Sequence, residues 1–262
     1  MSDFAVARLV CRNFSEQAMQ STPTRPSVVA IDVPTASAGD DIDPPYRAEG
    51  YNSTLLRSPR EPLVPMPGAI KSLLAPAFGY GEVSAQDADL TRQHAGEPLG
   101  ERIIVAGRLI DEDHRPIANA LIEIWQANAT GRYTHKGDQH SAPLDPNFSG
   151  NGRVMTDASG NYRFTTIKPG AYPWRNHANA WRPAHIHFSL FGLGYLSRLV
   201  TQMYFPGDPL LSLDPILNAV PSEKGRQSLV SRFDLGLTEP EWALGYRFDI
   251  VLRGDGATPM EK

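Results

Sequence analysis

The 262-residue chain has almost no cysteine, since Cys11 is its single thiol. One thiol cannot form an intrachain disulfide, so a small secreted fold held by disulfides is excluded. The sequence also has no apolar run of the roughly 18 residues that a membrane helix needs, and its N-terminus lacks the shorter apolar run of an export signal. We therefore expect a cytoplasmic protein that does not span a membrane.

An excess of basic residues is absent as well. The chain has 25 Lys and Arg against 29 Asp and Glu, which gives a formal net charge of −4. No basic run is long enough to neutralise a phosphate backbone, so nucleic acid is not expected as a partner. Hydrophobic residues make up 41% of the chain, which is enough apolar surface for a folded core.

Regular hydrophobic periodicity is missing from the first hundred residues. Residues 1–45 are rich in Ser, Thr, Pro, Asp and Ala, and their opening is a candidate for disorder. The stretch that follows is interrupted by Pro59, Pro62, Pro65, Pro67 and Pro76. Proline breaks helices and favours extended chain, which leaves Ala69 to Leu74 as a candidate for a helical turn. We predict that residues 1–100 form an extended N-terminal arm that contacts another subunit.

From Glu101 onward the sequence is typical of β-structure. We expect strands at Arg102 to Ile110, Ala120 to Trp125, Arg153 to Thr156, Tyr162 to Ile167, His185 to Phe191, Leu199 to Tyr204 and Tyr246 to Arg253. The turn Asp157-Ala158-Ser159-Gly160 is expected to join two of them as a hairpin. Because no crossover helices are visible, we predict an all-β fold, an antiparallel β-sandwich over residues 101–262 with few short helices.

His185-Ile186-His187 lies within one predicted strand, and side chains alternate along a strand, so both imidazoles should point to one face. Two neighbouring neutral imidazoles are a suitable pair of metal ligands. Taken alone, such a pair is more often incidental or hydrogen-bonded. No nearby cysteine, His-Glu-x-x-His motif or carboxylate in the strand completes a zinc site or a two-histidine, one-carboxylate iron(II) site. Any further ligands must therefore come from other segments.

Two tyrosines are candidates for those ligands. Tyr172 lies in the rigid segment from Lys168 to Trp174, and Tyr133 follows Gly131-Arg132. A buried tyrosine is ordinarily a core aromatic whose hydroxyl group is hydrogen-bonded. A phenol with a pKa of roughly 10 needs a strongly Lewis-acidic ion to lose its proton at neutral pH. A set of two histidines and two tyrosines would therefore favour iron(III).

The motifs around these residues are similar to those of one enzyme family. They are Gly131-Arg132-Tyr133, Asp145-Pro146-Asn147-Phe148, Thr166 to Trp174, and Trp181 to Phe188. Together they resemble the intradiol ring-cleaving dioxygenases, and the likeness runs from about Pro44 to Gly254. Within the family, the chain looks most like the iron-bearing β subunits that act on protocatechuate.

The resemblance implies one Fe(III) per chain, bound by Tyr133, Tyr172, His185 and His187. It also implies that the substrate displaces Tyr172, which takes up a substrate proton. The implied reaction cleaves protocatechuate (3,4-dihydroxybenzoate) with O₂ between its two hydroxylated carbons and incorporates both oxygen atoms. The product would be 3-carboxy-cis,cis-muconate, as in the β-ketoadipate pathway of aromatic hydrocarbon catabolism.

Further roles follow from the same resemblance. Arg182 matches an arginine that stabilises negative charge beside the metal, and a surface ion pair is its alternative interpretation. The implied substrate-binding residues are Tyr51, Trp174, Gln202 and Ile216, and Trp125 matches an aromatic near the iron. Ordinary packing is the alternative for these five residues.

The chain departs from its relatives at Asp214, where they often have cysteine before the Pro-Ile pair. An acidic side chain there could weaken or reposition an anionic substrate, so the substituent on the catechol ring stays open. The other histidines are expected to face solvent or to lie behind the ligands without binding metal: His94, His114, His135, His140 and His177.

The resemblance also implies a homologous α subunit as partner in a hetero-oligomer. A catechol or hydroxyquinol 1,2-dioxygenase would share the metal chemistry, but those relatives carry a helical N-terminal dimerisation domain that the proline-broken arm does not match. A non-catalytic β-sandwich binding module is the remaining alternative, and it predicts a colourless protein without iron.

Overall fold

The structure of the chain is a computed structural model that describes residues 42–48, 50–61, 83–176, 178, 180–191 and 199–261. The chain divides into two units, residues 1–35 and 36–262, and every described residue belongs to the second. The candidate helical turn at Ala69 to Leu74 lies outside the described residues, and so does His177. The predicted boundary between arm and catalytic domain near residue 100 stays a prediction.

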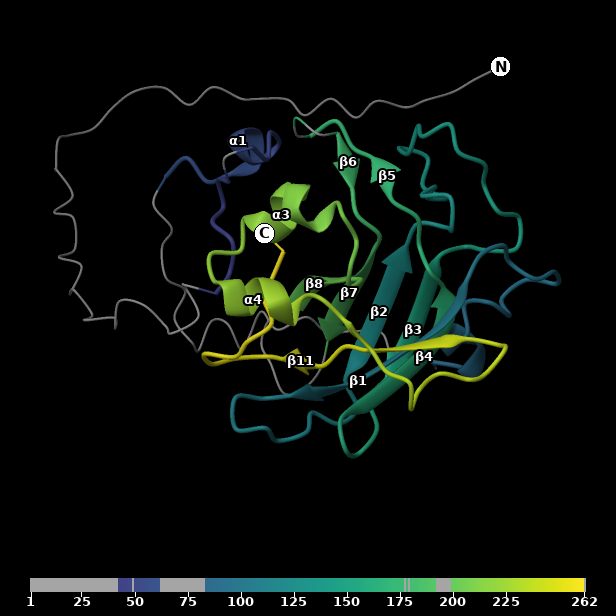
Figure 1. The fold of residues 1–262 in the computed structure, drawn as a ribbon. Helices are drawn as coiled ribbons and strands as arrows, with labels where there is room; N and C mark the ends of the chain where they lie inside the picture. The colour runs from purple at the N-terminus through teal and green to yellow at the C-terminus, as the bar shows by residue number, and fades with distance from the viewer. Residues whose placement is uncertain are drawn as a thin grey trace, which may run out of the picture. The chain divides into compact units, whose positions relative to one another are not determined.

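Most of the regular secondary structure in the described residues is strand (Figure 1). They are β1 (Arg102–Ile110), β2 (Leu121–Gln126), β3 (Asn151–Met155), β4 (Asn161–Ile167), β5 (Tyr172–Pro173), β6 (Trp181–Arg182), β7 (His185–Phe191), β8 (Leu199–Tyr204), β9 (Arg232–Phe233), β10 (Leu244–Arg247) and β11 (Ile250–Val251). The helices are short: α1 (Thr54–Arg57), η1 (Ala85–Ala88), η2 (Leu211–Leu213), α3 (Pro215–Asn218) and α4 (Glu223–Ser228). None of the described helices is long and apolar enough to cross a membrane.

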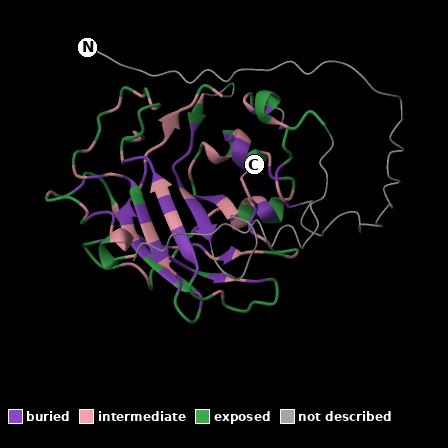
Figure 2. Ribbon diagram, turned by 180° about the vertical axis from the view of Figure 1, so that it is seen from behind, coloured by how far each residue is buried: buried purple, intermediate pink, exposed green. Residues whose placement is uncertain are grey.

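Two sheets carry the core. In one, β1 pairs with β4 on one side and with β10 and β11 on the other, and β9 pairs with β10. The other has the order β3-β2-β7-β8 and is antiparallel throughout. Side chains from both sheets form one apolar cluster, in which Val105 and Phe164 meet Ile124 and Phe188. Burial of each such side chain contributes about 1.5–3 kcal/mol. Figure 2 shows the buried residues concentrated in these strands.

The prediction of an all-β sandwich with few short helices is confirmed, with three corrections of detail. The turn at Asp157–Gly160 exists, because the Gly160 N–H donates to the Asp157 carbonyl at 3.0 Å. It does not close a hairpin, however, because β3 pairs with β2 while β4 pairs with β1, so the turn passes the chain from one sheet to the other. In addition, β1 pairs in parallel with β10 and β11, where antiparallel pairing was expected.

The strand predicted at Tyr246 to Arg253 is divided into β10 and β11. Between them the Phe248 carbonyl turns toward β1 and accepts a hydrogen bond from the Tyr162 hydroxyl group. This approach requires Gly107, because a Cβ there would lie 1.8 Å from the Phe248 oxygen. The Asp249 carboxylate, at the break, accepts from the Arg108 N–H at 2.9 Å, so the interruption is itself hydrogen-bonded.

Candidate metal centre

His185 and His187 share one face of β7, as their spacing predicted. Ile186 between them is fully buried in the core cluster. The opposite face of the sheet therefore carries both imidazoles, and the neighbouring strands add residues beside them. His187 lies opposite Gln202 of β8 and Trp125 of β2 in the strand registers. The Trp125 and His187 rings stack with centroids 4.7 Å apart and planes 4° apart, which fixes the orientation of that imidazole.

The two imidazoles direct ring nitrogens at each other, with their Nε2 atoms 3.2 Å apart. His185 Nδ1 lies 2.8 Å from the Pro183 carbonyl oxygen, which can only accept, so the ring proton is on Nδ1 and the Nε2 lone pair is free to accept. Burial lowers the pKa of both histidines, and the charge of Arg182 acts in the same direction, although Glu261 opposes the shift at His187. Both rings are therefore neutral, which is the form that binds metals.

A short hairpin, with two residues in each strand, brings Tyr172 to this pair of histidines. In it β5 pairs with β6, so that Tyr172 lies opposite Arg182 in the register. The Tyr172 hydroxyl oxygen is 3.4 Å from His185 Nε2. Sequence reasoning missed both strands, because each has two residues and one contains Pro173, which removes a ladder donor.

Tyr133 approaches from a separate loop that follows β2. The Asn128 carboxamide organises this loop, since its oxygen accepts from the N–H groups of Thr130 at 3.0 Å and Arg132 at 2.9 Å. The Tyr133 N–H donates to the Asp138 carboxylate at 2.7 Å. The Tyr133 ring stands perpendicular to that of Tyr172, with centroids 5.3 Å apart. All four predicted ligands therefore lie together, with His185 and His187 on β7, Tyr172 on β5 and Tyr133 in a loop.

The two phenols are protonated when no cation is present. Burial raises the pKa of Tyr133 well above 10, reinforced by the neighbouring Tyr172. Burial also raises the pKa of Tyr172, although Arg182 opposes this shift. Within the described part of the chain, the buried Tyr133 hydroxyl oxygen has no hydrogen-bond partner. An unpartnered buried hydroxyl group is costly, so a missing partner such as a cation would satisfy it.

These donors fit a ferric ion. Among the described residues, no three or more His, Cys, Asp and Glu side chains cluster so that they could hold a metal ion. The phenols of Tyr133 and Tyr172 are the further donors that the structure places beside His185 and His187. Phenolate is a hard anionic ligand, and two of them beside two neutral imidazoles suit a small trivalent cation better than zinc.

Gly131 allows the segments that carry Tyr133 and Tyr172 to approach each other. Its φ is +78°, and a Cβ at this position would lie 2.1 Å from the Ala171 carbonyl oxygen, next to Tyr172. We expect Gly131→Ala to destabilise the fold by roughly 1–3 kcal/mol and to displace Tyr172, which would lower the iron content. Chemical denaturation and metal analysis measure the two effects.

Gly207 provides a matched control for that variant, because its φ is +76° but no atom lies within 4 Å of its Cβ position. Gly207→Ala should lose stability because alanine disfavours a positive φ, but the variant should keep its iron. If both variants behaved alike, the close contact between the segments that carry Tyr133 and Tyr172 would not matter for the site.

Arg182 is buried, with 2% of its surface exposed, which excludes the surface ion pair considered for it. The Asp214 carboxylate accepts from its Nε at 3.0 Å and from its Nη2 at 2.9 Å. The Gln202 side-chain oxygen and the Tyr204 hydroxyl oxygen accept from the same Nη2. Nη1 then points to the site, 3.0 Å from His185 Nε2 and 3.4 Å from the Tyr172 hydroxyl oxygen.

This network corrects the hypothesis that Asp214 acts on an anionic substrate. The Asp214 side chain is fully buried, and its charge is paired with that of Arg182. It also accepts from the Tyr204 hydroxyl group at 2.7 Å. A carboxylate neutralised in this way orients the guanidinium and presents no free negative charge to a ligand.

The predicted pocket residues form two connected groups. Trp174 lines an open pocket of about 610 Å³ together with Tyr133 and Tyr172. Behind it, Tyr51 packs against the Trp174 ring at 5.1 Å and shares an apolar cluster with Ile216. Gln202 lies deeper, on the Arg182 guanidinium, and therefore does not line the open pocket with Trp174.

Other residues near the site were missed or predicted to be peripheral. Tyr204 contacts Arg182, and its position two residues after Gln202 on one strand is a signal that could have found it. Glu261 lies beside His187 and had no such signal, since it is far away in the sequence. Of the remaining histidines, His94, His114 and His135 are exposed, as expected, and the partly buried His140 ring contacts the Trp181 ring.

Comparisons with known proteins identify the family. A family profile described as Dioxygenase matches residues 74–254, and one described as Protocatechuate 3,4-dioxygenase beta subunit N terminal matches residues 40–69. The chain is 59% identical to a protocatechuate 3,4-dioxygenase beta chain from Burkholderia cepacia, over 84% of this chain and 94% of the relative. It is 30% identical to a protocatechuate 3,4-dioxygenase alpha chain from Pseudomonas putida, over 61% of this chain and 75% of that one.

A solved structure agrees on the fold. The 3-chlorocatechol 1,2-dioxygenase from Rhodococcus opacus 1CP superposes with a TM-score of 0.50 and 26% identity, covering 68% of this chain and 70% of that one. Intradiol dioxygenases depend on iron, in agreement with the donors described above. The chain therefore belongs to the intradiol ring-cleaving dioxygenase family and, within it, resembles the β chains of protocatechuate 3,4-dioxygenase over most of its length.

Proposed function

We propose that this chain is the catalytic subunit of an enzyme that cleaves protocatechuate with O₂ to 3-carboxy-cis,cis-muconate. The bond broken lies between the two hydroxylated carbons, and both oxygen atoms enter the product. One observation carries the proposal: two partly buried phenols and two neutral imidazoles converge in a chain that is 59% identical to a protocatechuate 3,4-dioxygenase beta chain.

In this proposal Tyr133, Tyr172, His185 and His187 hold one Fe(III) per chain. The unpartnered Tyr133 hydroxyl oxygen and the facing Nε2 atoms of the histidines support this ligand set. When bound, a ferric ion supplies Lewis acidity, which draws electron density from a catecholate and prepares the ring for attack by dioxygen. The protein residues must then position the ring and manage its protons and charge.

Tyr172 is suited to take up a substrate proton. Tyr172 lines the open pocket, its hydroxyl oxygen lies 3.4 Å from Arg182 Nη1, and burial favours the protonated phenol. A catechol has two hydroxyl protons to lose on binding as a dianion, so a phenolate that becomes a phenol accepts one of them. Arg182 then donates a hydrogen bond where negative charge develops, in a site where burial strengthens the interaction.

The pocket supports a ring that carries an anionic substituent. Arg175 lines the open pocket with Trp174, and the Asp214 charge is cancelled by Arg182. The pocket therefore offers an aromatic surface for the ring and a basic group for a carboxylate. A 1,2-dioxygenase of catechol or hydroxyquinol is disfavoured, because residues 40–69 match the N-terminal profile of protocatechuate 3,4-dioxygenase beta subunits.

Oxygen uptake tests this function. The assembly would be supplied in turn with protocatechuate, catechol and hydroxyquinol, and each product would be identified by mass. We expect the fastest uptake with protocatechuate and a product heavier than the substrate by one O₂. Preference for catechol or hydroxyquinol would indicate that the chain is a 1,2-dioxygenase. No oxygen uptake with any of the three substrates would favour a non-catalytic binding module.

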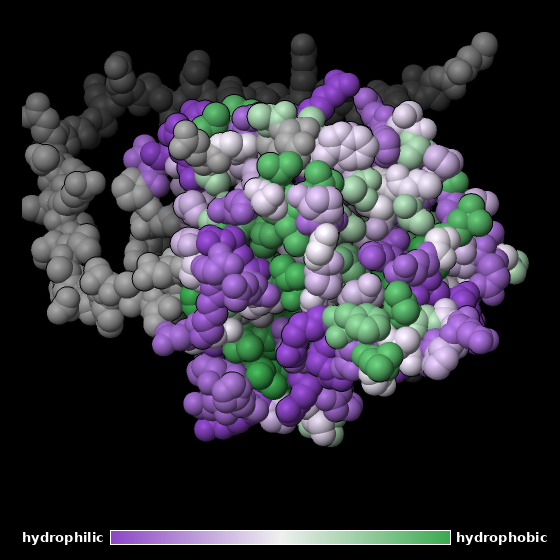
Figure 3. Space-filling view, viewed as in Figure 1, coloured by the Kyte–Doolittle hydropathy of each residue, from purple (hydrophilic) through white to green (hydrophobic). Residues whose placement is uncertain are grey.

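A homologous α subunit is the proposed partner, because the chain also resembles protocatechuate 3,4-dioxygenase alpha chains. Helix α1 exposes Leu55 at 56% and Leu56 at 85%, and Leu213 is 52% exposed. Hydrophobic side chains also gather near the middle of the face shown in Figure 3. Exposed apolar groups of this kind are typical of subunit contacts.

Co-expression tests this partner. We expect the isolated chain to be poorly soluble or weakly active, and expression with an α subunit encoded nearby should restore turnover. Oxygen uptake per milligram of β chain is the measurement. Full activity of the isolated β chain would count against the partner proposal.

A further inference from the structure

The outer ring nitrogen of His187 differs from that of His185. His185 Nδ1 has the Pro183 carbonyl as acceptor, whereas His187 Nδ1 is buried without a hydrogen-bond partner in the described structure. The Gln202 side-chain nitrogen is buried and unpartnered in the same way. His187 and Gln202 are cross-strand neighbours on β7 and β8, so two unsatisfied donors lie side by side.

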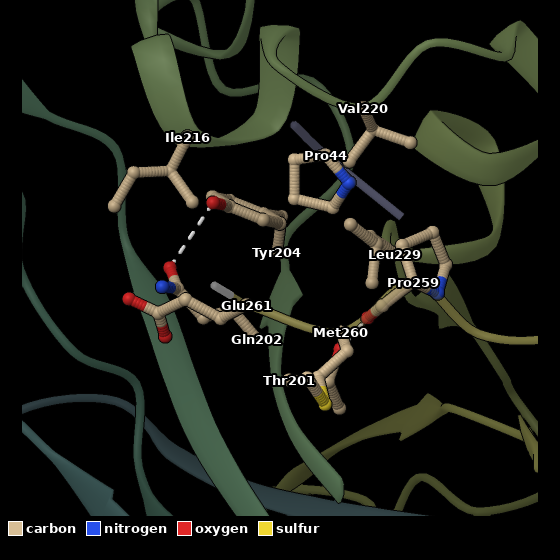
Figure 4. A pocket seen from close by; sticks show the side chains of 10 residues that line it. All are labelled: Pro44, Thr201, Gln202, Tyr204, Ile216, Val220, Leu229, Pro259, Met260 and Glu261. Atoms are coloured by element: carbon tan, nitrogen blue, oxygen red, sulfur yellow. Dashed lines mark hydrogen bonds between the residues drawn. The ribbon is translucent and has the colours of Figure 1, made fainter. Parts of the chain in front are cut away.

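The carboxylate of Glu261 is next to both donors. Its Oε2 atom is 3.6 Å from His187 Nδ1, slightly longer than a hydrogen bond. Figure 4 shows the carboxylate beside the Gln202 side-chain amide, at one side of a small cavity. One acidic side chain therefore lies within a short movement of two donors that lack a partner.

Backbone and side-chain hydrogen bonds hold this segment along β8. The Glu261 N–H donates to the Val200 carbonyl at 2.8 Å, and the Thr201 hydroxyl group donates to the Pro259 carbonyl at 2.8 Å. The Met260 N–H donates to the Asp43 carboxylate at 2.9 Å. The position of Glu261 is therefore built into the fold.

Glu261 carries a carboxyl group whose ionised form has acceptor oxygens and no donor. A carboxylate in this form can only accept hydrogen bonds, so it favours a proton on His187 Nδ1. The Nε2 lone pair of His187 is then left for the side facing His185.

We propose that Glu261 is a positioning residue that accepts the Nδ1 proton of His187 and so keeps the His187 Nε2 lone pair directed at the candidate metal centre. The inference rests on the proposed function, since it assigns Glu261 to the iron site. A carboxylate acceptor behind a metal-binding histidine fixes the tautomer and the ring orientation and strengthens the ligand. With Pro183 behind His185 and Glu261 behind His187, each imidazole has its own acceptor.

The test compares Glu261→Ala and Glu261→Gln with the wild type in the assembled, iron-loaded enzyme. A chelator is added, and the loss of iron is followed by metal analysis and by the visible absorption band. We expect Glu261→Ala to release iron about 10–100-fold faster. Glu261→Gln keeps an acceptor oxygen, so its rate of iron release should lie between those of the wild type and Glu261→Ala. Glu239→Ala, which removes a half-exposed carboxylate paired with Arg163, is the control and should match the wild type.

A second readout needs no metal. In the metal-free assembly with ¹⁵N-labelled histidine in the β chain, NMR should find the His187 proton on Nδ1 in the wild type and shifted toward Nε2 in Glu261→Ala. An unchanged tautomer and a wild-type rate of iron release would each overturn the role of Glu261. A wild type that holds no iron and consumes no oxygen would contradict the proposed function instead. The tautomer measurement would still test whether Glu261 positions His187.

Discussion

The Tyr133→Phe variant is expected to lose at least about 10²-fold in kcat while keeping part of the visible absorption band. Replacement of residues that merely support metal ligands costs about 10–100-fold, so the loss of a ligand should cost at least as much. The band should weaken without vanishing, because Tyr172 would still supply one tyrosinate for charge transfer to iron(III). Steady-state oxygen uptake and an absorption spectrum of the same sample measure both effects.

Tyr162→Phe is the matched control for this variant. It also removes a buried phenol oxygen, but one that donates to the Phe248 carbonyl in the core, away from the candidate metal centre. The control should lose about 1–3 kcal/mol of stability, because the Phe248 oxygen loses a buried partner, and should keep its colour. If Tyr133→Phe had the spectrum and turnover of the wild type, Tyr133 would not be a ligand.

The Arg182→Met variant is expected to lose about 3–5 kcal/mol of stability, because it leaves the fully buried Asp214 carboxylate without its counter-ion. The double variant Arg182→Met/Asp214→Leu removes both charges, so most of the stability should return. Activity should not return, since neither variant can donate the hydrogen bond that Arg182 Nη1 directs toward Tyr172. We expect kcat to fall by about 10²–10³-fold in both.

Denaturant unfolding and steady-state kinetics on the same preparations separate stability from catalysis. Arg247→Met serves as a control, because the Arg247–Asp234 pair is about a third exposed and should be worth no more than about 1 kcal/mol. A double variant with wild-type kcat would show that Arg182 has only a structural role. A single variant as stable as the wild type would contradict the account of the buried pair.

Local sequence patterns predicted the features of this chain that depend on strand periodicity. The alternation of His185, Ile186 and His187 required only that the segment be a strand. The turn at Asp157–Gly160 was recognisable from its residue types, but they do not determine which strand pairs with the next one. The hairpin of β5 and β6 was not predicted, because a strand of two residues is too short to show an alternating pattern.

Features that depend on long-range packing could not be predicted in this way. Asp214 was visible as an acidic residue near the pocket, but its neutralisation by Arg182 depends on where β6 and the start of α3 meet in space. Glu261 gave no signal, because its position beside His187 depends on the path of the segment along β8. The four candidate ligands were named from the family resemblance, and the fold brings them together.

The most direct test of the central claim is the iron content of the assembly measured together with its visible spectrum. The ligand set proposed here predicts about one iron per β chain and a red protein with a broad visible band. A colourless preparation with less than about a tenth of an iron per chain, even after reconstitution with ferric ion, would contradict it.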